Sequence, residues 1–286
     1  MFTSRTPRIA AALSAAALTT AGLTAAVAPA GAATAAPLNY TCSALGGMAA
    51  NLPFKATADT DAPATLQGGR SVTPKLTASI EVDEGTVSLM RDLLSAKSIS
   101  GTGTLETVVN GAMQSNAGTI ASIPVPASGS MTLPAVAQMA PIAGSKLGSI
   151  VIGVKNFKAV MVLTKNDGTT QDVDVTCIQD ADQNNIVDAM TVVKGNSATA
   201  TRLGWAARTK TLTATATVTP KATGKVSFVV TKNGKKFKTI VASINAKGQA
   251  VAKLARLRKG TYKVVAKYAG SAILKGSTAK AVSKRV

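Results

Sequence analysis

Residues 224–244 read GKVSFVVTKNGKKFKTIVASI, and this stretch decides the fold predicted for the last third of the chain. Val226 and Phe228 alternate with more polar residues, as in a strand with one buried face. Asn233 and Gly234 follow, and this pair suits the type I′ turn of a two-residue hairpin. The stretch therefore predicts two antiparallel strands joined by a tight turn.

The same alternation of apolar and polar residues continues on both sides of this hairpin. It predicts further strands within residues 211–220, 248–257, 260–270 and 279–286. About seven short strands of this spacing, in a segment of this size, indicate an immunoglobulin-like β-sandwich.

Charge divides the chain sharply. Residues 37–193 hold all 13 Asp and Glu residues beside nine Lys and Arg, whereas residues 194–286 hold 21 Lys and Arg and no acidic residue. Such a shift indicates a domain boundary. The stretch KGNSAT at 194–199 supplies the Gly, Asn and Ser of a hinge. We predict a middle domain over residues 36–192 and a basic domain over residues 193–286.

The N-terminus has the pattern of a secretory signal peptide, predicted over residues 1–35. Two arginines precede an uncharged apolar stretch from Ile9 to about Val27, and an Ala-rich segment with small-residue cleavage sites follows. Cleavage is expected near Ala35, with Ala32 as the alternative. A retained anchor is disfavoured because the Ala- and Thr-rich stretch is weakly hydrophobic. We expect a secreted, extracellular protein without a transmembrane span, or one associated with the cell surface.

Two cysteines, Cys42 and Cys177, are the whole cysteine content of the chain. An even pair in an oxidising compartment predicts a disulfide. A redox or metal role is disfavoured because the two cysteines lie far apart and the chain contains no His. The absence of His also removes the commonest general base. We therefore expect a protein that is not an enzyme and that needs no cofactor.

The middle domain is predicted to be mostly β. Strand-like runs occupy residues 75–82, 103–109, 149–164 and 170–178. Residues 86–97, TVSLMRDLLSAK, place apolar side chains on one helical face and predict one short helix. Prolines are expected to break the centre into loops, at Pro124, Pro126, Pro134 and Pro141. The fold class predicted for the whole chain is thus all-β.

Two stretches of the basic domain carry a resemblance to a known family. TVTPKATGKVSF (217–228) and LRKGTYKVVAKYAG (257–270) resemble the bacterial Ig-like repeat of secreted and surface proteins, especially of actinobacteria. Ser271 stands where members often have Asp, and the usual acidic residues are missing. Tyr262 resembles a tyrosine corner, whose hydroxyl is tied back to the backbone.

The middle domain also carries a resemblance. Its NYTC opening (39–42) and the C-x-x-D…Q segment from Cys177 resemble an actinobacterial secreted domain of unknown function. That domain is often followed by Ig-like repeats. The resemblance implies architecture and location, and no chemistry.

Lys and Arg alternate with apolar residues in the basic domain, so they are expected to face solvent. A surface that only solubilises usually mixes both signs, whereas this one is all positive. We therefore predict attachment to an anionic cell-wall polymer or acidic glycan, with salt-sensitive, nonspecific nucleic-acid binding in vitro. The candidate residues are Lys235, Lys236, Lys238, Lys253, Arg256, Arg258, Lys259, Lys263 and Lys267. A solubilising surface with Lys protecting the sheet edges stays the alternative.

One weak calcium candidate lies after the second cysteine. Asp180, Asp182, Asn184 and Asp188 have spacings like those of a calcium loop, but Asn185 and Thr191 replace the usual Gly and Glu. An exposed polar turn is the preferred interpretation. The sequence thus predicts a non-catalytic secreted or envelope-associated protein with an adhesive or structural role. The alternatives are a secreted enzyme with an unrecognised site in residues 36–192, or a purely structural spacer.

Overall fold

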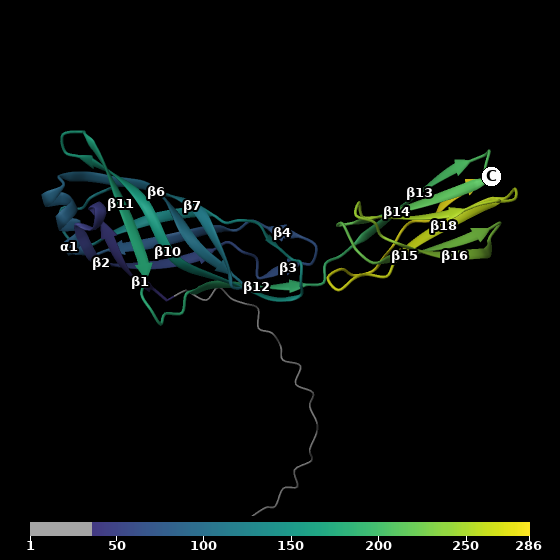
Figure 1. Cartoon of the computed structure of the whole chain (residues 1–286), viewed down its shortest axis with the longest axis horizontal. Coiled ribbons are helices and arrows are strands. Elements are labelled where there is room, and N and C mark those ends of the chain that lie inside the picture. Colours follow the sequence, from purple (N-terminus) through teal and green to yellow (C-terminus); the bar gives the residue numbers. More distant parts are fainter. Residues whose placement is uncertain (1–35) are drawn as a thin grey trace, which may run out of the picture.

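A computed structural model describes residues 36–286, so the predicted signal peptide lies outside the described residues. The chain forms two strand-rich units that lie end to end (Figure 1). Each unit has its own hydrophobic core, one formed within residues 38–192 and the other within residues 212–279. The predicted all-β class is confirmed.

The first unit contains twelve strands and a few helical turns among the described residues. Its strands are β1 (Leu38–Ala44), β2 (Ala49–Thr60), β3 (Thr65–Gln67), β4 (Ser71–Val72), β5 (Lys75–Val82), β6 (Ala96–Val109), β7 (Ala112–Pro124), β8 (Met131–Gln138), β9 (Ile142–Ala143), β10 (Gly148–Lys165), β11 (Thr170–Gln179) and β12 (Ile186–Val193). Its helical turns are η1 (Leu45–Gly47), α1 (Glu84–Ser88) and η2 (Leu89–Leu93).

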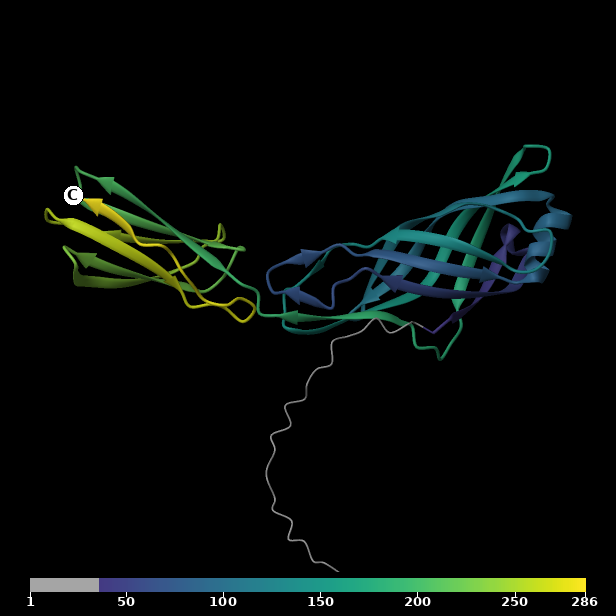
Figure 2. The ribbon, with the colours of Figure 1, turned by 180° about the vertical axis from the view of Figure 1, so that it is seen from behind.

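Eight of these strands close into a ring. The sheet runs β11-β1-β2-β5-β8-β7-β6-β10, and β10 pairs again with β11, so the first and last strands meet. Figure 2 shows the strands running around this ring from behind. Gly103 in β6 allows β6 and β10 to approach each other closely, because a Cβ on Gly103 would lie 2.4 Å from the carbonyl oxygen of Lys158. The alternate side chains that point inward form the core.

Two local predictions for this unit are wrong. The helix predicted at 86–97 begins earlier, at Glu84 in α1, and ends at Leu93 in η2, because Ala96 already starts strand β6. Pro124 is the last residue of β7, opposite Ser98, and Pro134 lies within β8 instead of in a loop. Pro134 pairs with Ser79 of β5, whereas β7 pairs only with residues 135–137 of β8. Pro134 therefore sits where β8 has one strand neighbour, which is where a residue without an N–H is tolerated.

The disulfide predicted between Cys42 and Cys177 is confirmed. The two cysteines lie directly opposite each other in the β1–β11 register, with a Cα–Cα distance of 4.0 Å. The bridge joins the first strand of the ring to a late one, across a sequence separation of 135. Among residues 36–286, no helix is both long and apolar enough to cross a membrane.

The second unit is a sandwich of two sheets, as predicted. One sheet contains β13 (Ala198–Ala206), β14 (Thr211–Thr219) and β17 (Gln249–Leu254). The other contains β15 (Lys225–Lys232), β16 (Lys235–Ser243), β18 (Thr261–Tyr268), β19 (Ser277–Thr278) and β20 (Val282–Arg285). The predicted tyrosine corner is confirmed, because the Tyr262 hydroxyl donates a hydrogen bond of 2.9 Å to the carbonyl oxygen of Arg258.

The stretch that links the two units forms backbone hydrogen bonds with both of them. Gly68, in the turn between β3 and β4, donates its N–H to the carbonyl oxygen of Val193 at 2.8 Å. Gly195 donates to Ile273 at 2.9 Å and accepts from Lys275 at 2.8 Å, both through the backbone. A Cβ on Gly68 would lie 2.2 Å from the carbonyl oxygen of Ile273, so the two units meet there without room for a side chain.

Candidate functional site

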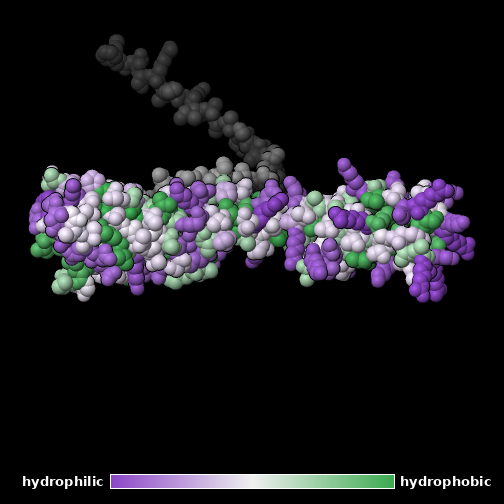
Figure 3. All heavy atoms as spheres, turned by 90° about the horizontal axis from the view of Figure 1, so that it is seen from above, coloured by the Kyte–Doolittle hydropathy of each residue, from purple (hydrophilic) through white to green (hydrophobic). Residues whose placement is uncertain are grey.

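Four segments of the sandwich meet at the end that points away from the first unit. They are the turn at residues 207–210, the hairpin turn with its flanking residues at 232–236, the loop at 255–260 and the C-terminal residues 284–286. The backbone N–H of Leu257 donates to Lys210 at 3.0 Å, which ties the loop to the first turn. Gly260 and Val286 exchange two backbone hydrogen bonds of 3.0 and 3.1 Å, which fixes the C-terminus beside the same loop. Figure 3 shows hydrophilic side chains projecting from this end of the molecule.

Five of the nine predicted cations lie at this end: Lys235, Lys236, Arg256, Arg258 and Lys259. All nine are exposed.

The other four predicted cations lie elsewhere on the sandwich. Lys263 is one step in from the end, in register with Thr231 and hence with Lys236 on the next strand. Lys238 and Lys267 lie farther along the same sheet, whereas Lys253 lies on the other sheet, opposite Thr213. The nine predicted residues therefore do not form one patch.

The structure adds five cations that the sequence interpretation missed. They are Arg208, Lys210, Lys232, Lys284 and Arg285. We refer to these five and the five predicted residues at the same place as the basic end. The spacing of these cations along the chain does not predict that they lie together, because four separate segments contribute to the basic end.

The strand register brings like charges together at the basic end. Lys232 lies directly opposite Lys235 on one side and Tyr262 on the other, and Tyr262 lies opposite Lys284. Three ammonium groups thus come from one row of residues across four strands about 4.8 Å apart. Like charges placed opposite each other destabilise a sheet. The Lys232 Nζ lies 5.4 Å from the Tyr262 ring centroid, a cation–π contact that offsets part of this repulsion.

No acidic side chain compensates the basic end from within its own unit. Residues 194–286 contain no Asp or Glu. Within the described residues, the one side-chain ion pair is Arg91–Asp92, and it lies in the first unit. A one-signed surface of this kind attracts polyanions and carries self-repulsion that bound anions would relieve.

The weak calcium candidate does not form a ligand cluster. Asp180 accepts a hydrogen bond of 2.8 Å from the Thr41 hydroxyl, and Asp188 accepts one from Thr60 in β2. Asp182 and Asn184 lie in the turn between β11 and β12. In residues 36–286, no three His, Cys, Asp or Glu side chains are grouped so that they could hold a metal ion.

Two family models match the chain, one within each of its two units. Residues 39–188, more than half of the chain, match the family of unknown function DUF6801. The chain belongs to this family. We call its first unit the DUF6801 domain. Residues 196–286 match the bacterial Ig-like domain of group 3, and we call this unit the Ig-like domain. A comparison with curated proteins finds no match.

Solved structures align only distantly. A Corynebacterium diphtheriae protein described as membrane anchored aligns at 12% identity and a TM-score of 0.40, over 86% of this chain and 57% of that one. The major pilin subunit BcpA of Bacillus cereus aligns at 13% identity and 0.19, over 82% and 67%. A two-domain fibronectin type III segment of chicken tenascin aligns at 15% identity and 0.22, over 80% and 96%. The chain spans 57% of the length of the first of these proteins.

Proposed function

We propose that this protein is a non-catalytic, extracellular or envelope-associated protein whose Ig-like domain binds an anionic cell-wall polymer or acidic glycan through its basic end. The observation that carries this proposal is the gathering of ten cations from four segments at one end of a domain that has no acidic residue. The Cys42–Cys177 disulfide and the bacterial Ig-like domain both support an extracellular location.

The geometry of the basic end favours a flexible, charged polymer over a folded partner. Its cations stand on turns and strand ends, and all of them except the half-buried Lys232 are exposed. Lys and Arg placed this way neutralise charges along a chain and release counterions, which makes binding strongly salt-dependent. Single-stranded nucleic acid is less suited, because the stacking aromatic side chains that such ligands need are few.

The test compares two variants of the full chain that lose the same net charge. The first replaces Lys235, Arg256, Arg258 and Lys259 with Gln at the basic end. The second replaces Lys194, Lys221, Lys247 and Lys275 with Gln, all exposed and at the other end of the Ig-like domain. Retention is measured on a polyglycerol-phosphate polymer and on a polyuronic acid across a salt series, with duplex DNA as the nonspecific comparator.

The basic-end variant is expected to bind more than about tenfold more weakly at low salt, at about 1 kcal/mol per lost charge contact before screening. The matched variant should lose much less. Equal losses in both variants would show that net charge alone acts. No retention of the wild-type chain on either polymer would contradict the proposal. It would indicate that the positive charge serves only solubility, as in a structural spacer.

A further inference from the structure

The interior of the DUF6801 ring contains an apolar cavity at the end away from the Ig-like domain. Its volume is about 480 Å³, within the usual range of small-molecule sites. Its walls come from inward-facing side chains of the ring, among them Phe54, Leu133, Phe157 and Val173. No lining residue is charged, and Thr86 supplies the one hydroxyl group among them. Nothing in the sequence pattern predicts this cavity, because its lining residues come from distant segments.

The cavity continues along the ring axis. A second, narrower cavity of about 70 Å³ lies deeper in the same interior, beside Leu38, Ala58 and Leu76. Ile80, Ile120, Phe157 and Ala159 line both spaces, so the two adjoin. A linear molecule can extend from the wider space into the narrower one, which is too small for a compact ligand.

Two connections between strands frame the mouth of the cavity. Met48 follows η1, whereas Leu89 and Leu93 belong to η2. These three side chains line the cavity and are also 87%, 46% and 70% exposed. Large apolar side chains exposed together at the edge of an apolar cavity indicate an interaction site.

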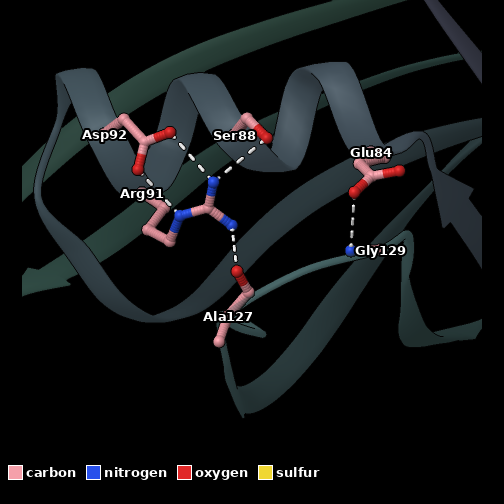
Figure 4. Close-up of polar contacts among 6 residues, drawn as sticks. All are labelled: Glu84, Ser88, Arg91, Asp92, Ala127 and Gly129. Atoms are coloured by element: carbon pink, nitrogen blue, oxygen red, sulfur yellow. Dashed lines mark hydrogen bonds and ion pairs between the residues drawn. The ribbon is translucent and has the colours of Figure 1, made fainter.

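Polar contacts hold the α1–η2 segment over this end of the ring. Arg91 Nη1 donates a hydrogen bond of 2.5 Å to the carbonyl oxygen of Ala127, and Gly129 N–H donates one of 3.1 Å to Glu84 Oε1 (Figure 4). Arg91 also pairs with Asp92 at 2.7 Å, and this contact lowers the pKa of the Asp92 carboxyl. The segment is thus tied to the 125–130 loop on one side, and its exposed leucines border the mouth.

The chemistry of the walls decides the class of ligand. A peptide would bury N–H and C=O groups that the walls cannot satisfy, and a charged group would lose its hydration without gaining a partner. A saturated hydrocarbon chain has neither cost and gains contacts with the apolar walls.

We propose that the DUF6801 domain binds a single linear hydrocarbon chain, such as the acyl chain of an amphiphile, with the chain inside the ring and the polar head at the mouth between η1 and η2. This site is separate from the basic end and does not depend on the proposal that the basic end binds an anionic polymer. If one of the two proposals is contradicted, the other is unaffected.

The experiment titrates the full chain with N-phenyl-1-naphthylamine, an uncharged probe whose fluorescence rises in apolar surroundings. An uncharged probe avoids attraction to the cations of the Ig-like domain. Dodecanol and dodecanoate then compete with the probe. Displacement by both would show that the chain is recognised, whereas displacement by dodecanoate alone would overturn recognition through hydrocarbon. Absence of any fluorescence rise with the wild-type protein would also overturn the proposal.

Two pairs of variants locate the bound probe. Val173→Phe fills the cavity and should weaken probe binding at least tenfold, whereas Val241→Phe makes the same change on an exposed position of β16 and should leave binding unchanged. If Val173→Phe does not fold, Leu93→Asp at the mouth decides, with a loss of at least threefold expected. Its matched control is Met113→Asp, at the 62% exposed Met113 near the opposite end of the ring. Equal binding by a folded variant and its control would overturn the proposal.

Discussion

At the scale of single residues, the ionisation of Tyr40 makes the stability of the ring depend on pH. It is buried in β1, donates a hydrogen bond of 3.1 Å to the carbonyl oxygen of Lys155 and packs edge-on against Phe157. Burial raises the pKa of Tyr40 from its ordinary value of 10.0 to about 12, opposed by the side chain of Gln179. The neutral phenol is therefore favoured in the folded state.

This shift predicts a loss of stability at high pH. The unfolded chain releases the Tyr40 proton near pH 10, whereas the folded chain holds it until about pH 12. The contribution is fully present below pH 10 and is lost as the pH rises through 12, by up to about 3 kcal/mol. Urea unfolding at pH 8, 10 and 11 should show this decline in the wild-type chain and a smaller one in Tyr40→Phe. Parallel pH profiles for the two proteins would contradict it.

Other residues show where reasoning from local sequence works. Tyr262 was identified as a tyrosine corner because the preceding Leu257 and Gly260 match the motif, and a hydrogen bond over four residues is local. The cysteine pair was identified because the chain offers only one pairing. Pro134 was misplaced because its tolerance depends on which strand lies beside it, and a neighbouring strand is not a local property.

At the scale of elements, the turn between β3 and β4 joins the two domains. Gly68 approaches Ile273 so closely that any Cβ would meet a carbonyl oxygen at 2.2 Å. Leu274 lies against the neighbouring Gly69, where a Cβ would come within 3.1 Å of its Cδ2. This contact holds the hydrogen-bonded residues around Gly195 in place.

We expect Gly68→Ala to open this junction. Loss of the backbone contacts around Gly195 should favour local opening by about 1–2 kcal/mol and raise the rate of trypsin cleavage after Lys194 roughly tenfold. Limited proteolysis followed by mass spectrometry measures that rate. Gly204→Ala is the matched control, since a Cβ at Gly204 meets nothing within 4 Å. Unchanged cleavage in Gly68→Ala would show that the contact does not restrain the link.

Strands were the best predicted elements. Residues 75–82 form β5 with the predicted bounds, and the hairpin around Asn233-Gly234 forms β15 and β16. Residues 75–82 alternate apolar and polar side chains throughout, which on a half-buried sheet indicates a strand. The hairpin was predictable because alternate residues from Val226 onward are apolar and the Asn-Gly pair suits a tight turn. Strand β13 was not identified, because small Ala and Thr residues dominate it until Leu203 and Trp205. Its place is decided by pairing with β14.

At the scale of the whole molecule, two cores within one chain predict two unfolding transitions. The Cys42–Cys177 bridge lies entirely within the first core. In the chain-entropy account, a loop closed across 135 residues contributes up to about 5 kcal/mol by restricting the unfolded chain.

Replacing both cysteines with Ala should therefore destabilise only the DUF6801 domain, by about 2–5 kcal/mol. Differential scanning calorimetry of the wild-type and double-variant chains resolves the two transitions. The transition of the Ig-like domain serves as the internal control and should keep its midpoint. A single transition that shifts as a whole would show instead that the two cores unfold together.

The sequence by itself determined what depends on composition and short-range pattern. This includes the all-β class, the sandwich, the cysteine pair and the confinement of positive charge to residues 194–286. The sign of a residue's charge and the alternation of apolar residues along a strand do not depend on how the strands are arranged. Tertiary structure alone decided the closure of β10 onto β11, the cavity inside that ring and the basic end. Each of these brings together residues from distant segments, and strand pairing, which depends on the packing of the whole sheet, sets which segments meet.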